Sequence, residues 1–456
     1  MITARAFAGK HYAVYGLARS GLATVEALLA SGARVTAWDS DPATIENIRS
    51  SRAKSRDIDG VSTSLDTNGL GFANLDTADL SQFDSLVVTP GLPLNTHPIA
   101  QRARDAGVEI IGDIELFARA RPELPPHKVV GITGTNGKST STALVHHILE
   151  TAGVPTSMGG NIGLPILAQD PLPEGGVYVL ELSSYQLDLT QSLDCDVAVL
   201  LNVTPDHLDR YDGLEAYADS KARLFEMQSP KRYIVLDNET DCQFGSAEFA
   251  ADPWIIFFDD RHLVDPNVDF TRQSDWPALQ GPHNADNAAA SVAVMSALSQ
   301  DGVAGLTVDA ILQGLRTFRG LPNRMERIRD KDGVLFVNDS KATNPTATAP
   351  ALAAFPAIRW ILGGRAKTDN LDECAPHFDH VRSAYTIGEA AELFEAVLKP
   401  HMAVKNCREL GEAVKAAAHD AESGDTVLLS PACASFDQFR DFEERGDAFR
   451  SAVGAL

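Results

Sequence analysis

The chain has 456 residues, more than a single hydrophobic core usually supports, so we expect more than one domain. Hydrophobic residues make up 44% of the sequence and charged residues 22%, which is ordinary for a globular protein and excludes a disordered or fibrous chain. The formal net charge of −23 argues against nucleic acid or an anionic membrane surface as the main partner.

The cysteine pattern and the apolar runs bear on the compartment. Five cysteines are scattered without a CxxC pair, which favours a reducing environment over a disulfide framework. Met1 to Lys10 lacks the basic stretch and apolar run of a secretory signal. No apolar stretch approaches the roughly 20 residues that cross a bilayer. We therefore expect a cytoplasmic protein without membrane insertion.

The first 120 residues alternate apolar runs with helical patterns. A helical pattern at Ser20–Ala30 lies among short apolar runs at His11–Tyr15, Ala33–Asp39, Ser85–Thr89 and Val108–Ile111. This alternation predicts βαβ units on a parallel sheet. Three prolines between Arg121 and His127 cannot continue a helix or a central strand, so we place a domain boundary there.

A second α/β pattern follows the boundary. Lys128–Ile132 is apolar and β-branched, a glycine loop follows it, and Ser139–Ala152 has helical spacing. Val177–Leu182 and Val197–Val203 read as buried strands with polar residues at their carboxyl ends. Those ends matter because open parallel sheets bind ligands just outside the carboxyl ends of their strands.

The pattern begins afresh near Gly320. The expected elements are a helix at Thr346–Ala354 and strands at Val334–Val337, Arg359–Leu362, Tyr385–Ile387 and Thr426–Leu429. We therefore predict an α/β protein of three domains with boundaries at 1–120, 121–320 and 321–456. The first and third are expected to be Rossmann-like, and the central one a mixed α/β domain of the P-loop ATPase type.

The loop after Lys128–Ile132 is the strongest chemical signal. It consists of Gly134, Thr135, Asn136, Gly137, Lys138, Ser139 and Thr140. Backbone N–H groups of such a turn and the amino end of the next helix attract phosphate, lysine adds a charge, and a hydroxyl can bind Mg²⁺. Ile132 stands where the strict motif has its first glycine, so the loop is a variant. A plain structural turn is the alternative, and the Lys-Ser-Thr run favours nucleotide binding.

A weaker loop lies near the start, Gly16-Leu17-Ala18-Arg19-Ser20-Gly21, where Ala18 replaces the middle glycine of a dinucleotide fingerprint. It could bind a nucleotide diphosphate at the helix amino end or only close a tight turn. Asp39, at the end of the next strand, is placed for a ribose or base contact or is an ordinary turn residue.

Several further blocks, taken together, resemble the Mur ligases of peptidoglycan synthesis over nearly the whole chain. Besides the phosphate loop they are Asn161–Pro165, Glu181–Ser184, Asp206–Arg210, Lys221, His283–Asn287, Arg324, Asn338–Asn344, Leu362–Gly364 and Ser430–Ser435. The histidine-bearing loop of the first ligase of the series is absent, as is the Asp-Asn-Pro-Arg motif of the diaminopimelate-adding ligase. The resemblance implies an ATP-dependent amide ligase that adds D-glutamate to UDP-N-acetylmuramoyl-L-alanine through an acyl phosphate.

The resemblance also implies a metal site. Ser139, Glu181 and His207 would bind Mg²⁺, with hydrogen bonding to substrate as the alternative for His207. Lys221 would be carbamoylated and would help to hold a second Mg²⁺, whereas a lysine on the predicted helix Glu215–Met227 is ordinarily only solvated. Lys138, His207 and Lys221 are the implied catalytic residues.

Further implied residues contact ATP and the two substrates. Asn284, Asn287, Arg324 and Asp339 would contact ATP, with helix capping as the alternative for Asn284. The implied substrate contacts are Asn161, Lys341, Thr343, Lys367, Ser435, Phe436 and Phe442 toward the joined ends, and Arg19, Ser20, Asp39, Ser40 and Gly91 toward UDP. The two phenylalanines could equally belong to a core. Asp41 stands where the familiar form has an arginine.

Three other readings remain open from the sequence. A different Mur-type or folylpolyglutamate-type ligase is one alternative, and a relative that adds L-glutamate is another, because nothing in the sequence distinguishes the two isomers. A P-loop nucleotide switch or binding protein would not need Lys367 and Ser435. The expected partners are small molecules, and we expect a monomer.

Overall fold

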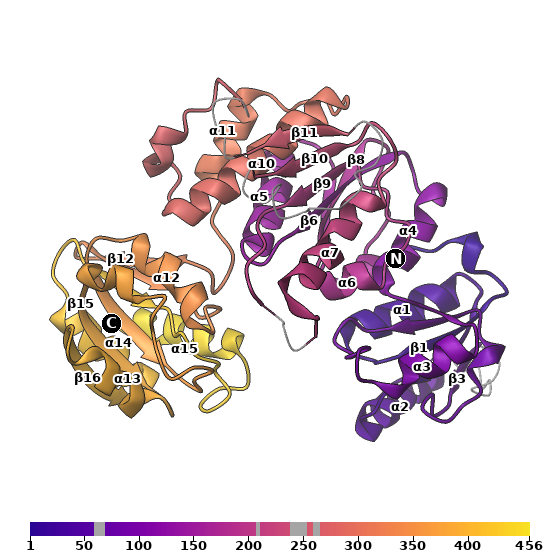
Figure 1. Cartoon of the computed structure of the whole chain (residues 1–456), viewed down its shortest axis with the longest axis horizontal. Coiled ribbons are helices and arrows are strands. Elements are labelled where there is room, and N and C mark those ends of the chain that lie inside the picture. Colours follow the sequence, from indigo (N-terminus) through magenta and orange to yellow (C-terminus); the bar gives the residue numbers. More distant parts are fainter. Residues whose placement is uncertain (59–68, 207–209, 238–252, 259–264) are drawn as a thin grey trace. The chain divides into compact units, whose positions relative to one another are not determined.

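The computed structural model describes residues 1–58, 69–206, 210–237, 253–258 and 265–456. Three β-sheets follow one another along the chain, each with its own helices (Figure 1). The chain divides into two compact units. The first unit comprises Met1–Lys138, Leu149–Asp265 and Val292–Thr307, and the second comprises Ser139–Ile148, Pro266–Ser291 and Val308–Leu456.

The first sheet is parallel throughout, in the order β3-β2-β1-β4-β5. Its strands are β1 (His11–Tyr15), β2 (Arg34–Trp38), β3 (Leu70–Phe72), β4 (Ser85–Val88) and β5 (Glu109–Ile111), and its helices are α1 (Arg19–Ala30), α2 (Pro42–Ile58), α3 (Pro98–Asp105) and α4 (Asp113–Ala120). All four residues of β4 are buried, as expected for a strand covered on both faces. This doubly wound order agrees with the predicted Rossmann-like fold.

The second sheet is also parallel, in the order β11-β10-β9-β6-β8-β7. Its strands are β6 (His127–Thr133), β7 (Thr156–Gly160), β8 (Gly176–Glu181), β9 (Val197–Leu200), β10 (Tyr233–Leu236) and β11 (Trp254–Phe257). The helices of this part of the chain are α5 (Lys138–Thr151), α6 (Ser184–Asp188), α7 (Gly213–Glu226), α10 (Pro282–Gln300) and α11 (Val308–Thr317). Ile132 of β6 pairs with Glu181 and with Val199, so the carboxyl ends of β6, β8 and β9 lie level.

The third sheet has the order β12-β13-β17-β14-β15-β16. Its strands are β12 (Glu326–Lys331), β13 (Val334–Asn338), β14 (Ile358–Gly363), β15 (Val381–Ile387), β16 (Ala403–Arg408) and β17 (Thr426–Leu429), and its helices are α12 (Pro345–Ala353), α13 (Ala391–Leu398), α14 (Leu410–Asp420) and α15 (Phe442–Gly454). Only β12 is antiparallel to its neighbour. The carboxyl ends of β13, β17 and β14 are therefore adjacent.

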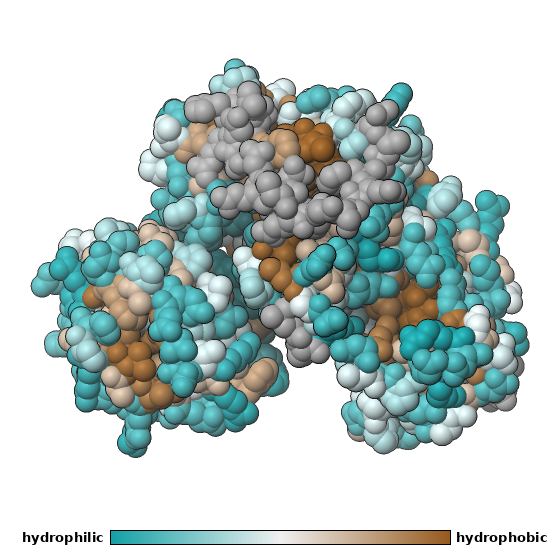
Figure 2. All heavy atoms as spheres, viewed as in Figure 1, coloured by the Kyte–Doolittle hydropathy of each residue, from teal (hydrophilic) through white to brown (hydrophobic). Residues whose placement is uncertain are grey.

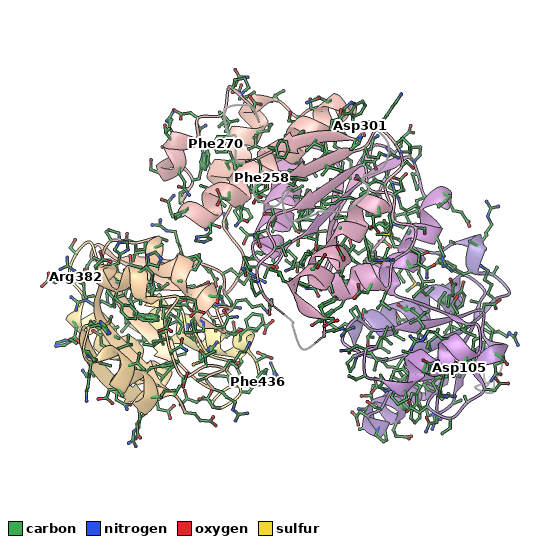
Figure 3. All side chains as sticks on the ribbon, viewed as in Figure 1. Asp105, Phe258, Phe270, Asp301, Arg382 and Phe436 are labelled. Carbon is green, nitrogen blue, oxygen red and sulfur yellow. The ribbon has the colours of Figure 1, made fainter. Side chains whose placement is uncertain are left out.

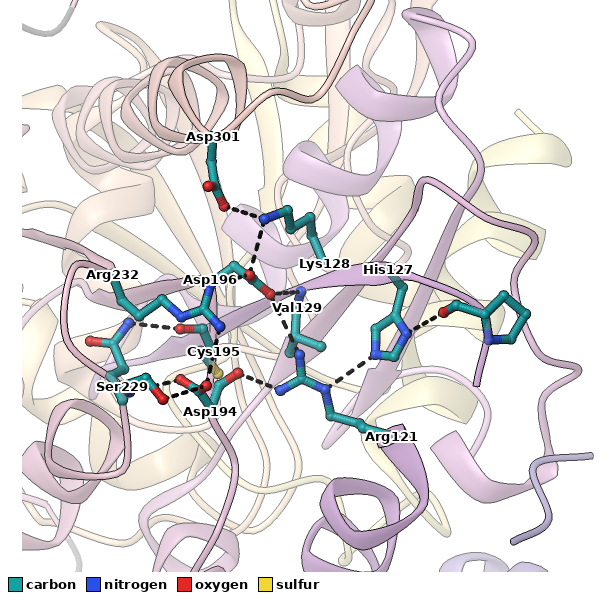
Figure 4. Close-up of polar contacts among 12 residues, drawn as sticks. Arg121, His127, Lys128, Val129, Asp194, Cys195, Asp196, Ser229, Arg232 and Asp301 are labelled. Carbon is teal, nitrogen blue, oxygen red and sulfur yellow. Dashed lines mark hydrogen bonds and ion pairs between the residues drawn. The ribbon is translucent and has the colours of Figure 1, made fainter. Parts of the chain in front are cut away.

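A polar cluster surrounds one buried carboxylate at the opposite, amino ends of β6, β9 and β10 (Figure 4). Its centre is Asp196, whose side chain is 4% exposed and accepts from the Val129 backbone N–H at 2.8 Å and from Arg232 Nη1 at 2.7 Å. Lys128 Nζ lies 3.3 Å and Arg121 Nη2 3.5 Å from the same carboxylate. The other members are Asp194, Ser229, His127 and Asp301.

Most predicted elements lie within one or two residues of their observed positions. The strand predicted at Val197–Val203 ends earlier, at Leu200, because the next residues turn toward the phosphate loop: Leu201 N donates to Thr133 O, and Asn202 O accepts from Thr135 N. Among the described residues, no helix is both long and apolar enough to cross a membrane. Hydrophilic residues cover most of the face drawn in Figure 2.

Candidate active site

The phosphate loop leaves the carboxyl end of β6 and runs into α5. Gly134 has a φ of +151° and Gly137 a φ of +84°, conformations that favour glycine. A Cβ on Gly134 would lie 3.0 Å from Leu201 Cβ, so a side chain would crowd the neighbouring strand end. Asn202 braces the loop, since its Oδ1 accepts from Asn136 N at 2.8 Å. Sequence reasoning missed Asn202, because the strand predicted at Val197–Val203 included it, whereas β9 ends at Leu200.

Two lysine amines donate to one carbonyl oxygen of this loop. Lys138 Nζ donates to Gly134 O at 2.8 Å, and Lys221 Nζ donates to the same oxygen at 2.9 Å. Lys221 is 1% exposed and its Nζ lies 4.3 Å from the ring centroid of Tyr217. Burial, and secondly the charge of Lys138, lower the pKa of Lys221 to about 6. Lys221 is therefore largely a neutral amine at neutral pH.

Glu181 ends β8 level with the loop and is 2% exposed. Its Oε1 accepts from Asn161 Nδ2 at 2.9 Å. Its Oε2 is buried without a hydrogen-bond partner among the described residues. A buried carboxylate oxygen is rarely left without a donor or a cation, so Oε2 fits a metal ligand. Asn161 is thereby placed beside Glu181, as a partner of this carboxylate.

The predicted metal set is only partly described. His207 lies outside the described residues, so its placement is not part of this site. No group of three or more His, Cys, Asp and Glu side chains in the described part of the chain is arranged to hold a metal ion. The carboxylate oxygen Oε2 of Glu181 is itself a ligand type that suits a hard cation such as Mg²⁺.

In the second unit, Ser139 forms a hydrogen bond with Arg324. Ser139 is 5% exposed and its Oγ accepts from Arg324 Nη2 at 2.8 Å. Arg324 is flanked by Asn323 and Met325, whose φ values of +64° and +47° are unusual for residues with a side chain. This constrained backbone fixes the direction in which the guanidinium leaves the chain. Thr140 follows Ser139 in α5.

Asn284 and Asn287 join a hydrogen-bond chain near the start of α10. Ser141 Oγ donates to Asn287 Oδ1 at 3.1 Å, Asn287 Nδ2 donates to Asn284 Oδ1 at 3.1 Å, and Asn284 Nδ2 donates to Gln280 O at 3.0 Å. Asn284 lies inside α10, which begins at Pro282, and its Oδ1 accepts from a side chain, so the described contacts do not include an N-cap at Asn284.

Asp339 follows β13 and is buried. Its Oδ1 accepts from Met325 N at 3.1 Å and its Oδ2 from Ser430 Oγ at 2.8 Å. Burial raises the pKa of Asp339 to about 7, although these two hydrogen bonds and the charge of Arg324 oppose the rise. Asp339 and Arg324, which the sequence placed in one site, therefore influence each other.

The predicted amino-acid contacts lie on loops after β13, β14 and β17. Lys341 Nζ lies 3.8 Å from the ring centroid of Phe442, while Lys367 is exposed and Thr343 is half-buried. Phe436 is 64% exposed (Figure 3), so the core alternative is wrong for it. Ser435 is only 2% exposed.

In the first sheet, Asp39 closes the weaker loop. Its Oδ2 accepts from Leu17 N at 2.7 Å and its Oδ1 from Asp41 N at 2.9 Å. Asp41 accepts from Ala43 N and Thr44 Oγ1 and so caps α2, which explains an aspartate here. Arg19, Ser40 and Gly91 are exposed, and Ser20 is half-buried.

A polar cluster on the same sheet was not foreseen. Tyr15 Oη donates to Asp76 Oδ1 at 3.1 Å, Trp38 Nε1 donates to Asp76 Oδ2 at 3.3 Å, and His97 Nε2 lies 3.4 Å from Tyr15 Oη. Tyr15 and Trp38 end β1 and β2, so the cluster lies at the carboxyl edge of the sheet. No motif marks these residues in the sequence.

Three family models match successive parts of the chain: the Mur ligase MurD-like N-terminal domain over residues 10–112, the Mur ligase middle domain over 132–295, and the Mur ligase glutamate ligase domain over 323–433. The UDP-N-acetylmuramoylalanine–D-glutamate ligase of Novosphingobium aromaticivorans is 57% identical to this chain. The alignment covers 100% of this chain and 97% of that protein. That of Sphingopyxis alaskensis is 54% identical and covers 100% of both chains. The chain belongs to the Mur ligase family.

Solved Mur ligase structures share the fold. MurF of Thermotoga maritima in complex with ADP has a TM-score of 0.58 at 16% identity, over 98% of this chain and 96% of its own. MurC of the same organism has a TM-score of 0.55 at 15% identity, over 98% and 99%. The predicted α/β fold class, the Mur ligase family and the class of ATP-dependent, carbon–nitrogen bond-forming ligase are thus confirmed.

Proposed function

We propose that this Mur ligase joins D-glutamate to UDP-N-acetylmuramoyl-L-alanine, with release of ADP and phosphate, in the cytoplasmic synthesis of peptidoglycan precursors. The observation that carries the proposal is the set of relatives with this printed activity, among them chains at 57%, 50% and 40% identity that cover 100% of this chain. The described phosphate loop, with Lys138 at its end, supports it.

The proposed reaction has two steps, the transfer of a phosphoryl group and the formation of an amide bond. The alanyl carboxylate attacks the γ-phosphorus of ATP, and ADP leaves with the electrons of the broken P–O bond. The glutamate amine then attacks the acyl phosphate, loses a proton, and phosphate leaves. Both steps need held phosphates and compensated charge more than covalent help. Loop residues 134–140, with Asn284, Asn287, Arg324 and Asp339, hold ATP in this proposal.

In the proposed enzyme Ser139, Glu181 and His207 would hold one Mg²⁺, and a carbamoylated Lys221 would help to hold a second. The free buried Oε2 of Glu181 supports the first assignment. When bound, Mg²⁺ neutralises charge on the transferring phosphoryl group. Asn161 orients Glu181 through the hydrogen bond to Oε1.

Lys221 is proposed to carry a carbamate. Its neutral amine adds to the carbon of CO₂ and releases a proton, which converts a buried neutral amine into a buried carboxylate. The lowered pKa, to about 6, supports this because only the neutral amine reacts. Tyr217 and the Gly134 carbonyl hold the amine in place. Lys138, His207 and Lys221 are the proposed catalytic residues.

The remaining roles follow the three sheets. Arg19, Ser20, Asp39, Ser40 and Gly91 bind the UDP part, and Lys341, Thr343, Lys367, Ser435, Phe436 and Phe442 bind the ends that are joined. We propose domains at 1–120, 121–320 and 321–456, which the three matched segments support. We propose a cytoplasmic monomer. The four described cysteines are free, in keeping with a reducing compartment.

Phosphate release tests the function. The chain is mixed with ATP, Mg²⁺, UDP-N-acetylmuramoyl-L-alanine and either D- or L-glutamate, and the product is identified by mass. We expect release with D-glutamate only, and none when either substrate is omitted. Release with L-glutamate alone contradicts the stereochemical assignment, and no release with either isomer contradicts the ligase. Release without an amino acid favours a nucleotide switch, and product with a folate or another muramoyl peptide favours the other ligases.

A further inference from the structure

A fully buried arginine lies among the strand ends of the third sheet. Arg445 is in α15 and is 1% exposed, although a guanidinium loses much hydration energy when it is buried. Such cations are usually paired with a carboxylate. In the described part of the chain, Arg445 forms no ion pair, and Asp437, the acidic side chain whose charge reaches it, instead accepts from Glu389 N.

The Arg445 guanidinium binds carbonyl oxygens instead. Nη2 donates to Ser340 O at 2.8 Å and to Cys433 O at 3.1 Å, and Nη1 donates to Gly363 O at 3.5 Å. These three residues stand at or just beyond the carboxyl ends of β13, β17 and β14, which are neighbours in the sheet. One planar fork therefore joins three adjacent strand ends.

The same guanidinium reaches a fourth group through a hydroxyl. Arg445 Nε donates to Ser340 Oγ at 3.0 Å, and Ser340 Oγ donates to Phe442 O at 2.9 Å. Phe442 is the ring over which Lys341 Nζ lies. The position of Lys341 is thus tied to Arg445 on two sides, through Phe442 and through the Ser340 backbone.

The backbones of these loops approach one another closely beside Arg445. Gly364 has a φ of +129°, and a Cβ there would lie 2.3 Å from Ala434 O and 3.2 Å from Arg445 Nη1. Arg365 and Ala434 exchange two backbone hydrogen bonds, which joins the loops after β14 and β17. Ala432 holds a φ of +56°, a strained conformation for alanine that its surroundings must maintain.

Each of the three loops carries at least one proposed contact to the ends that are joined, and the loops after β14 and β17 carry proposed contacts to the amino acid. Lys341 follows Ser340, Lys367 follows Gly363, and Ser435 follows Cys433. We propose that Arg445 is the positioning residue of the glutamate site: its fork fixes these three loops in register, and its charge favours an amino acid with two carboxylates. This inference rests on the proposed function and adds the residue that organises its specificity.

Arg445→Met and Arg445→Lys test the proposal in the full chain. Methionine keeps the length without the charge, and lysine keeps the charge without the fork. We expect Arg445→Met to raise the KM for D-glutamate by about 10-fold to 100-fold, the range for lost hydrogen bonds to a charged group. Arg445→Lys raises it less. The KM for UDP-N-acetylmuramoyl-L-alanine stays unchanged in both.

Arg359→Met is the matched control. Arg359 lies at the other end of β14 and pairs with Asp425 at 2.8 Å, so its loss weakens the same sheet away from the loops. An unchanged KM for D-glutamate in Arg445→Met, or an equal rise in Arg359→Met, overturns the inference. If Arg445→Met does not fold, Arg445→Lys decides, since a wild-type KM there overturns it. A wild-type chain without ligase activity overturns the proposed function instead.

Discussion

Asp196 offers the sharpest test of how the central sheet is stabilised. Around it, Arg121, Lys128 and Arg232 face three carboxylates, Asp194, Asp196 and Asp301, so the cluster is balanced. Asp196→Asn keeps the shape of the side chain and leaves three cations against two carboxylates. Because the Asp196 side chain is 4% exposed, we expect a loss of about 3–5 kcal/mol in the free energy of unfolding, the range for a broken buried ion pair.

Asp301→Asn is the control for Asp196→Asn. Asp301 is 25% exposed and, among the residues that the structure describes, forms an ion pair only with Lys128, at 2.6 Å, so its loss should cost below about 1 kcal/mol. In calorimetry, the transition of the central sheet should fall by about 6–20 °C for Asp196→Asn and by only a few degrees for Asp301→Asn. Equal shifts for the two variants would refute the reasoning, because burial would then make no difference to the cost.

Three further predictions concern the candidate site. Lys221→Ala should lower kcat about 100-fold, and bicarbonate should raise the activity of the wild type but not of the variant; a fully active variant contradicts the carbamate. Because burial raises the pKa of Asp339 to about 7, the carboxyl of the unfolded chain ionises from about pH 4 while the buried one keeps its proton, so wild-type stability should fall as the pH rises from 4 to 7. Asp339→Asn should remove that fall, as urea unfolding at several pH values would reveal. Gly160→Ala should abolish phosphate release, because its Cβ would lie 2.1 Å from Glu181 O and would displace the end of β8. Wild-type activity in this variant would show that the end of β8 can shift without loss of function.

Much of the fold could be predicted because its signals are local. Apolar runs such as Val177–Leu182 and the glycine turn before Lys138 identify the strands and the loop without knowledge of the rest of the chain. β12 was missed, because Glu326–Lys331 is an edge strand with alternating charges and little apolar character. β16, another edge strand, was missed for the same reason.

The candidate site was predictable where motifs carry it and not where tertiary contacts do. Glu181 and Asn161 belong to separate sequence blocks, and only pairing of β7 with β8 brings them to 2.9 Å. The lowered pKa of Lys221 depends on burial and on Lys138, neither of which is visible at position 221. Arg445 has no motif of its own, since its backbone partners lie at or just beyond the ends of three strands that are adjacent in the sheet but far apart in the sequence.

Lys138 and Lys221 both donate to the oxygen atom of Gly134, so the proton affinity of Lys221 depends on whether an anion is bound in the phosphate loop. Any anion that draws the Lys138 ammonium away from this oxygen removes a repulsive charge beside Lys221, which then holds its own proton more firmly. By reciprocity, a protonated Lys221 strengthens the attraction for that anion. A nucleotide that arrives first therefore disfavours the neutral amine, and the order in which CO₂ and ATP meet the enzyme should change the length of the lag before steady turnover.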